Sequence, residues 1–193
     1  LLLGRQPTAP EAAVFNAALV SLVEHGVTPN VIATRMTYLG APESLQGAVA
    51  AGLLGLGTRF VGTIEGAARD LDGALAAMRA TDPSGGAPSD RAVAAEAERI
   101  VAGHRADGRH VPGIGHPVHT PTDPRAEALL DLAGRHGFTD TPARLLRAVS
   151  AAASSASGRL LPVNVTGAIG ACVVLLGVDP RIARGLGVIA VSY

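Results

Sequence analysis

The sequence predicts an all-α protein, and two observations carry that prediction. Hydrophobic residues make up 48% of the 193-residue chain and aromatic residues only 3%, so the core must consist mainly of Ala, Leu, Val and Ile. Ala and Leu are strong helix formers. The apolar residues also recur with helical spacing between breaks rich in Gly and Pro. No stretch alternates convincingly as a strand does, although VIAVSY at 188–193 would alone pass for one.

Helices in the first part of the chain are expected between breaks at HGVTPN, GAPES and TDPSGGAPSD. The expected ranges are 10–25, 29–39, 43–56 and 61–80. Two of these helices carry a proline in the first turn, where the N–H groups have no partner within the helix. The third range is small and apolar almost all round, which predicts a fully buried helix. Its apolar run is too short for a membrane span.

The second part of the chain follows a loop at 81–90 that is rich in Pro, Gly, Ser and Asp. Its helices are expected at 90–107, 124–136, 142–157, 164–176 and 180–190. Pro124 begins the second of these helices, and Gly158 ends the third. The helix at 164–176 is again small and apolar, which predicts a second buried helix. This number of helices without a sheet is typical of an all-α fold.

Composition limits the classes of function. Sixteen basic residues, all of them Arg, balance 16 acidic residues, whereas nucleic-acid-binding proteins usually carry a basic excess. The single cysteine, Cys172, lies in an apolar run, which predicts a buried, inert thiol and fits a reducing, cytoplasmic compartment. The first residues, LLLGRQPTAPEA, do not have the pattern of a signal peptide, and no 18-residue apolar run occurs, so no membrane partner is expected. The chain opens on three leucines without Met, so we expect its N-terminus to be incomplete.

Three clusters hold residues suited to chemistry. The first is EHG, where His25 ends an expected helix, and the second is GIGHPVHTPTDPR, which contains His116, Asp123 and Arg125. The third is ARGLG, in which Arg184 has apolar neighbours. Glycines before His116 allow backbone or a ligand to approach closely, and the proline after it restricts the chain. A buried arginine is unfavourable unless it faces an anion.

Each cluster also has a simpler structural explanation. His25 would only complement a helix dipole, and Asp123 would only cap a helix ahead of an exposed Arg125. Arg184 would simply extend to solvent. The other histidines are expected to be solvated: His104, His110, His119 and His136.

Taken in order, these motifs resemble the citrate synthase superfamily. The series is HG, a small-residue helix ending in GTRFVG, then PGIGHPV, DPRA, PVNV and ARGLG. The likeness covers nearly the whole chain, and it is closest to citryl-CoA lyases and to the citrate-synthase-like module of ATP-citrate lyase. Its most specific part is the PGIGHPV and DPRA block, with His116 nine positions before Arg125.

The resemblance implies a large helical domain and a smaller domain that closes over the active site. Residues 1–62 and 164–193 would form the large domain, incomplete at both termini, and residues 63–163 the small domain. The protein would be a homodimer that joins or splits an acyl-CoA and a 2-oxo dicarboxylate such as oxaloacetate. No metal and no permanently bound cofactor are implied, because the coenzyme A thioester is a substrate.

The resemblance also implies roles for individual residues. His116 would hydrogen-bond the oxo-acid carbonyl, or the citryl alcohol in the reverse direction. Arg125 and Arg184 would hold the carboxylates of the substrate, with His25 beside them. These roles are chemically consistent, because guanidinium forks fit carboxylates and an imidazole stabilises charge on the oxo oxygen. The backbone that approaches coenzyme A would be Pro112, Gly113, Ile114 and Gly115.

Two positions depart from the synthase pattern. Phe60 replaces a histidine of citrate synthases, and this replacement favours the lyase branch of the family. Thr166 replaces the aspartate that serves as acid and base in synthases and lyases alike. A threonine hydroxyl is no general base near neutral pH without help, and losing such a group typically lowers the rate by about 10²–10⁴-fold.

We therefore carry two hypotheses. The first is a citryl-CoA lyase-like enzyme, with His116 and Thr166 in the catalytic positions, that cleaves a 3-hydroxyacyl-CoA or runs the reverse condensation. The second is a catalytically degenerate protein that binds acyl-CoA or a dicarboxylate on the same scaffold. A purely structural helical dimer would leave the coincidence of His116, Arg125 and Arg184 unexplained.

Overall fold

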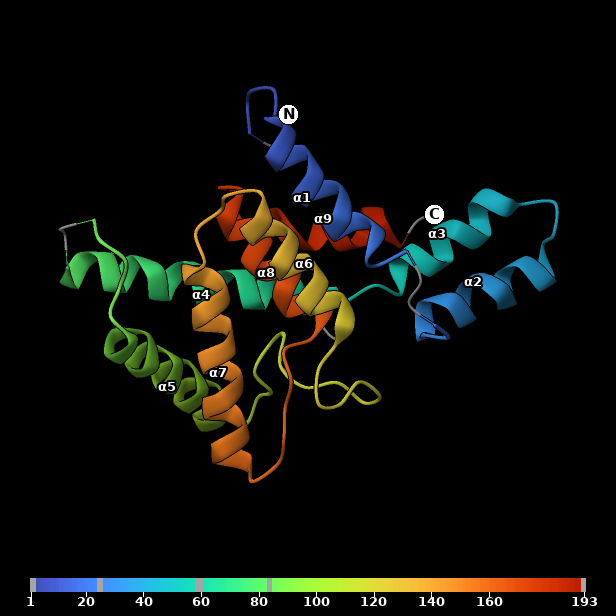
Figure 1. Cartoon of the computed structure of the whole chain (residues 1–193). Helices are drawn as coiled ribbons and strands as arrows, with labels where there is room; N and C mark the ends of the chain where they lie inside the picture. Colours follow the sequence, from blue (N-terminus) through green and yellow to red (C-terminus); the bar gives the residue numbers. More distant parts are fainter. Residues whose placement is uncertain (1–2, 24–25, 58–60, 83–84, 192–193) are drawn as a thin grey trace.

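A computed structural model describes residues 3–23, 26–57, 61–82 and 85–191 (Figure 1). Within these residues the protein is all-α, as predicted, with one isolated antiparallel bridge between Ile114 and Val163 and no strand. The helices are α1 (Ala9–Val20), α2 (Pro29–Gly40), α3 (Leu45–Leu54), α4 (Gly62–Thr81), α5 (Asp90–Ala106), α6 (Pro124–Arg135), α7 (Thr141–Ser157), α8 (Val165–Leu175) and α9 (Ala183–Ala190). A 3-10 turn, η1 (Pro180–Ile182), leads directly into α9.

Helix α8 is the centre of the core. Every residue from Val165 to Val173 is buried, and the helix packs against α4, α6 and α7. Its contact with α4 is close, because a Cβ added at Gly170 would lie 2.8 Å from the Cβ of Ala67. This confirms the buried helix predicted for 164–176.

Helices α5 and α7 lie side by side and, with α4, make a second part of the core (Figure 1). The buried face of α5 includes His104, whose side chain was expected to be solvated. His104 is only 8% exposed, and its Nε2 lies 2.7 Å from Oδ2 of Asp70 on α4. The expectation of solvation was therefore wrong for His104, because a carboxylate partner satisfies one side of its imidazole. His110 and His136 are exposed, as predicted.

Helices α2 and α3 form a hairpin that projects from the rest of the chain (Figure 1). The prediction that 43–56 is a fully buried helix was wrong, because only Ala48 and Gly52 of α3 are buried. Small residues let α3 approach α2 closely, but several large apolar side chains of the two helices stay exposed. We call these side chains the hairpin surface: Ile32, Met36, Leu39, Leu45 and Leu54, exposed by 50%, 62%, 74%, 64% and 88%.

Two other expectations need correction at the ends of helices. Helix α1 ends at Val20, not at residue 25, with turn and bend residues after it. Residues 188–190 belong to α9, so the strand that VIAVSY suggested does not form there. None of the helices in the described ranges combines the length and the apolar character that crossing a bilayer requires.

Candidate functional site

The loop before His116 is tied to the segment that leads into α8. Backbone N–H of Asn164 donates to the carbonyl of Gly113 at 3.0 Å, and N–H of Gly115 donates to the carbonyl of Pro162 at 2.7 Å. The side-chain amide of Asn164 also donates to the carbonyl of Gly115, at 2.7 Å. These bonds join the loop that carries His116 to the first turn of the helix that carries Thr166.

Glycine is required at the centre of this loop. Gly113 has φ +79°, a left-handed conformation that other residues rarely adopt. A Cβ at Gly113 would also lie 2.5 Å from Cα of Gly167 in α8. On the other side, Pro112 packs against Gly66 of α4, where a Cβ would lie 2.8 Å from the proline ring. The loop is therefore held between α4 and α8.

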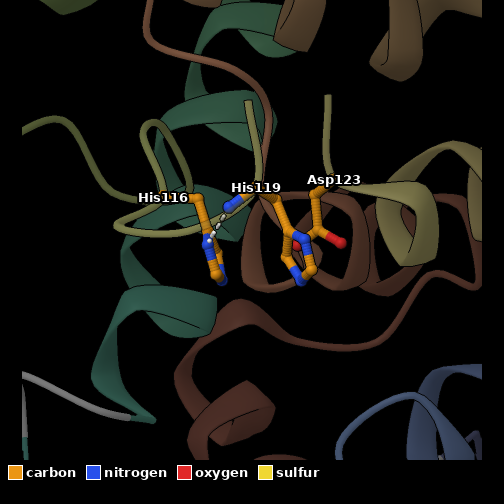
Figure 2. Close-up of side chains that lie close together, drawn as sticks. All are labelled: His116, His119 and Asp123. Atoms are coloured by element: carbon orange, nitrogen blue, oxygen red, sulfur yellow. Dashed lines mark hydrogen bonds between the residues drawn. The ribbon is translucent and has the colours of Figure 1, made fainter. Parts of the chain in front are cut away.

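Hydrogen bonds to Nδ1 favour one neutral tautomer of the His116 imidazole. Its Nδ1 accepts backbone N–H groups of Val118 at 3.1 Å and of His119 at 2.9 Å. A nitrogen that accepts hydrogen bonds carries a lone pair, so the neutral ring carries its proton on Nε2. Figure 2 shows the bond from the His119 backbone to this ring. His116 is thereby prepared to donate a hydrogen bond through Nε2.

Arg125 lies next to this donor. Its Nη2 is 3.3 Å from Nε2 of His116, and a guanidinium can only donate hydrogen bonds. Two hydrogen-bond donors this close together form a site for an oxygen atom that accepts a hydrogen bond from each. A carbonyl or carboxylate oxygen of a ligand would meet this requirement. The nine-residue spacing read from the sequence thus brings His116 and Arg125 together at one point.

Asp123 holds Arg125 in this position. The carboxylate is the N-cap of α6 and accepts the backbone N–H and Nε–H of Arg125 on Oδ1, both at 3.1 Å. Its Oδ2 accepts Nη2–H of Arg125 and the backbone N–H of Val165, both at 3.0 Å. Burial of this side chain raises its pKa, but the hydrogen bonds and charge of Arg125 and the bond from Val165 outweigh burial, and the pKa of Asp123 is lowered.

Thr166 begins α8 with its hydroxyl already engaged. Oγ1 donates to Oδ1 of Asn164 at 2.7 Å, and the same oxygen accepts the backbone N–H groups of Thr166 and Gly167. Asn164 is thus the N-cap of α8, and Thr166 is 9% exposed. Within the described part of the chain, the hydroxyl proton points to the amide oxygen of Asn164, which is not a base. The threonine side chain therefore supports the capping residue Asn164 and is not activated for proton transfer.

Arg184 is ion-paired, and it does not simply extend into solvent. Its Nε lies 3.2 Å from Oε2 of Glu65, in an ion pair without hydrogen-bond geometry, and its side chain is 43% exposed. The other oxygen of Glu65 pairs with Arg69 at 2.7 Å. The anion that this arginine faces is therefore a carboxylate of the chain itself. His25 and Phe60 lie outside the described residues.

Sequence reasoning missed His119 at this site. It was expected to be solvated, but its ring is half-buried and lies 4.4 Å from the ring of His116, centroid to centroid (Figure 2). The available signal was the spacing of three residues, because the tight turn that returns the His119 N–H to His116 also brings the two rings together. Glu65 was also missed, since nothing local to it points to Arg184.

The donor chemistry of this cluster does not fit a metal ion. Nitrogen and oxygen atoms of His116, His119 and Asp123 lie within 4.8 Å of one another. However, Nδ1 of His116 already accepts two N–H groups, and both oxygens of Asp123 accept N–H groups. A cation at this place would also face the guanidinium of Arg125.

Cys172 plays no part in the site. It is 1% exposed in α8, and burial raises the pKa of its thiol to about 12. A thiol with such a pKa is protonated near neutral pH, which agrees with the predicted inert thiol.

Comparison with solved structures gives three informative relatives. Citryl-CoA lyase from Hydrogenobacter thermophilus is 30% identical with a TM-score of 0.82, over 99% of this chain and 68% of that chain. ATP citrate lyase from Methanothrix soehngenii, solved with citrate and coenzyme A, is 23% identical with a TM-score of 0.72, over 98% of this chain and 31% of its own. Citrate synthase from Thermotoga maritima is 18% identical with a TM-score of 0.71, over 98% of this chain and 48% of its own.

The last two relatives support the fold alone, and this chain spans less than half of each of them. A comparison with curated protein sequences finds no match. The family model for the C-terminal domain of citrate synthase matches residues 1–191. By this match, and by its likeness to a citryl-CoA lyase, the chain belongs to the citrate synthase family.

Proposed function

We propose that the protein cleaves a 3-hydroxyacyl-CoA of the citryl-CoA type to acetyl-CoA and oxaloacetate, or runs the reverse condensation. The observation that carries this proposal is the convergence of two donors, Nε2–H of His116 and the guanidinium of Arg125, whose nitrogens lie 3.3 Å apart. Likeness to a citryl-CoA lyase at 30% identity supports the same reaction class.

His116 stabilises charge on the oxygen at the reacting carbon. In cleavage, the substrate hydroxyl gives its proton to a water molecule, its oxygen becomes a carbonyl, and the carbon–carbon bonding pair moves into the thioester as an enolate. A proton from water then adds to the enolate carbon to give acetyl-CoA. With its proton on Nε2, His116 has no lone pair there to remove the hydroxyl proton, so its role is to donate to the developing oxyanion.

Arginines anchor the carboxylates of the substrate in this proposal, with His25 beside them. Arg125 presents a guanidinium whose Nε edge is held by Asp123, which leaves its outer edge for a carboxylate. Arg184 binds a carboxylate only by sharing or releasing Glu65. Coenzyme A lies against the loop of Pro112, Gly113, Ile114 and Gly115, where the polar groups of Gly113 and Gly115 are largely occupied, so contacts are mainly apolar.

The enzyme works as a homodimer in this proposal, with a second copy covering the hairpin surface. Between residues 27 and 57 the only charged residues are Arg35 and Glu43, and large apolar side chains are exposed there. An exposed apolar patch of this kind is typical of a protein interface. Residues 63–163 act as the small domain, which closes on the large domain formed by 1–62 and 164–193.

A second candidate function is a binding protein without turnover. It is favoured by Thr166, whose hydroxyl donates to the amide oxygen of Asn164, which is not a base. In this alternative, coenzyme A thioesters and dicarboxylates bind as in the enzyme, but no residue protonates the enolate carbon.

The two functions are separated by incubation with citryl-CoA and measurement of oxaloacetate release. The lyase proposal expects turnover by the native protein, its loss in His116→Ala, and its retention in His136→Ala, which changes an exposed histidine on the surface. The binding alternative expects no turnover by the native protein, turnover by Thr166→Asp, and coenzyme A binding measured by calorimetry. The second set of results would reject the lyase proposal.

A further inference from the structure

The tripeptide Asp-Pro-Arg occurs twice in the chain, and its local geometry is the same both times. Asp123 and Asp179 each accept the backbone N–H of the arginine two residues on, at 3.1 Å and 2.9 Å. Each also accepts Nε–H and Nη2–H from that arginine, which is Arg125 or Arg181. The tripeptide alone therefore explains a capping aspartate with the arginine folded back on it.

The surroundings of the two copies differ. The Asp123 side chain is 0% exposed and that of Asp179 is 40% exposed. Their arginines differ in the same way, with Arg125 at 30% and Arg181 at 77%. An exposed ion pair contributes little to stability, whereas a wholly buried carboxylate is unfavourable unless its oxygens are satisfied.

Asp123 makes one contact that capping does not require. Its Oδ2 accepts the backbone N–H of Val165, 42 residues along the chain, at the first residue of α8. An N-cap needs only one oxygen, and Ser, Thr or Asn would supply it equally well. The charge and the second oxygen of Asp123 therefore serve the contacts with Arg125 and Val165.

We propose that Asp123 is a positioning residue that sets the Arg125 guanidinium against His116 and ties this pair to the first turn of α8. Because its side chain is fully buried, Asp123 acts through Arg125 and Val165 and does not touch the substrate. The proposal rests on the proposed function in one respect, namely that Arg125 binds a carboxylate of the ligand. A guanidinium held on its Nε edge enters binding already oriented.

The first test compares Asp123→Asn with Asp179→Asn. Asparagine retains a capping oxygen but loses the charge and one acceptor, so Arg125 is released while α6 keeps its cap. We expect the affinity for oxaloacetate, measured by calorimetry, to fall by about 10-fold or more in Asp123→Asn, the usual cost of losing a hydrogen bond to a charged group. Asp179→Asn should change it by less than about twofold, because that pair is exposed. Equal affinities in the two variants would overturn the proposal.

The second test asks whether Asp123 acts through Arg125. Lysine keeps the charge of Arg125 but cannot make the two-pronged contact with a carboxylate. If the two residues act as one unit, the double variant Asp123→Asn/Arg125→Lys binds oxaloacetate no more weakly than Arg125→Lys alone. An effect of Asp123 on binding that does not pass through Arg125 predicts instead that the two losses of affinity multiply, and that result would overturn the proposal.

Two further measurements cover failure of folding and failure of the proposed function. If Asp123→Asn does not fold, Arg125→Lys is compared with Arg181→Lys by thermal denaturation. Only Arg125→Lys should have a lower melting temperature than the native protein, and equal melting temperatures of the two variants would overturn the proposal. If the native protein binds no oxaloacetate, the proposed function fails. Hydrogen exchange at the arginine Nε–H, followed by NMR, then decides: Arg125 should lose protection in Asp123→Asn, and unchanged protection would overturn the proposal.

Discussion

Replacement of Thr166 by aspartate should raise the rate of citryl-CoA cleavage by about 10²–10⁴-fold, the usual contribution of one general acid–base group. The native hydroxyl donates to Oδ1 of Asn164 at 2.7 Å and therefore has no proton acceptor that would activate it. A carboxylate on the same backbone position would supply the missing acid and base beside the loop that carries His116.

The substitution should leave the fold intact. It removes one hydrogen bond between Thr166 and Asn164, which is worth about 1 kcal/mol. A negative charge in the first turn of α8 contributes about 0.3–1 kcal/mol in the opposite direction. These two effects nearly cancel, and Asn164 still caps the helix through the backbone N–H groups of residues 166 and 167. Burial of the new carboxylate, at a position that is 9% exposed, adds a cost, so the melting temperature should fall although the fold is kept.

The assay follows oxaloacetate release from citryl-CoA by native protein and three variants. Thr166→Asn matches aspartate in shape but has no base, and Thr166→Val removes the hydroxyl alone, so only Thr166→Asp should gain activity. The reasoning fails if the folded Asp and Asn variants turn over at the same rate. It also fails if the native protein turns over and Thr166→Val abolishes that turnover, because the hydroxyl would then take part directly.

Three other predictions follow from the packing. Gly113→Ala should destabilise the fold by more than about 2 kcal/mol, since it combines strain at φ +79° with a Cβ 2.5 Å from Cα of Gly167. The control Gly103→Ala, in open space on α5, should instead stabilise the fold by about 0.5–1 kcal/mol. Equal melting temperatures of the two variants would contradict this prediction. If the protein is the proposed homodimer, Leu39→Glu on the hairpin surface should give a folded monomer in light scattering, and a variant that stays dimeric would place the interface elsewhere. The thiol of Cys172, with its pKa raised to about 12, should resist alkylation at pH 8 until the protein is unfolded, and rapid labelling of the native protein would refute its burial.

Much of the fold could be predicted because helix ends are encoded locally. Proline in first turns and glycine after last turns placed most helices within a few residues of their observed bounds. Burial was harder, because residues 43–56 and 164–176 share a small, apolar composition. Only α8 is buried, since α4, α6 and α7 surround it, while α3 meets little beyond α2. A small, apolar composition allows a helix to be buried, but the tertiary contacts determine whether other helices cover it.

The candidate site divides in the same way. The pairing of His116 with Arg125 was predictable from a short spacing within one motif. The bond from Val165 to Asp123 joins residues 42 positions apart, and the pairing of Glu65 with Arg184 joins helices distant in sequence. Such contacts depend on how α4, α6, α8 and α9 pack, so a local sequence pattern does not predict them.

The central claim is that His116 and Arg125 both donate hydrogen bonds to an oxygen of a bound oxo acid. Calorimetric titration with oxaloacetate of the native protein and of His116→Ala tests this most directly. The native protein should bind, and the variant should bind about 10- to 100-fold more weakly, because a hydrogen bond to a charged group is worth about 1.5–3 kcal/mol. A native protein that binds no oxaloacetate, or a variant that binds as tightly as the native protein, would contradict the claim.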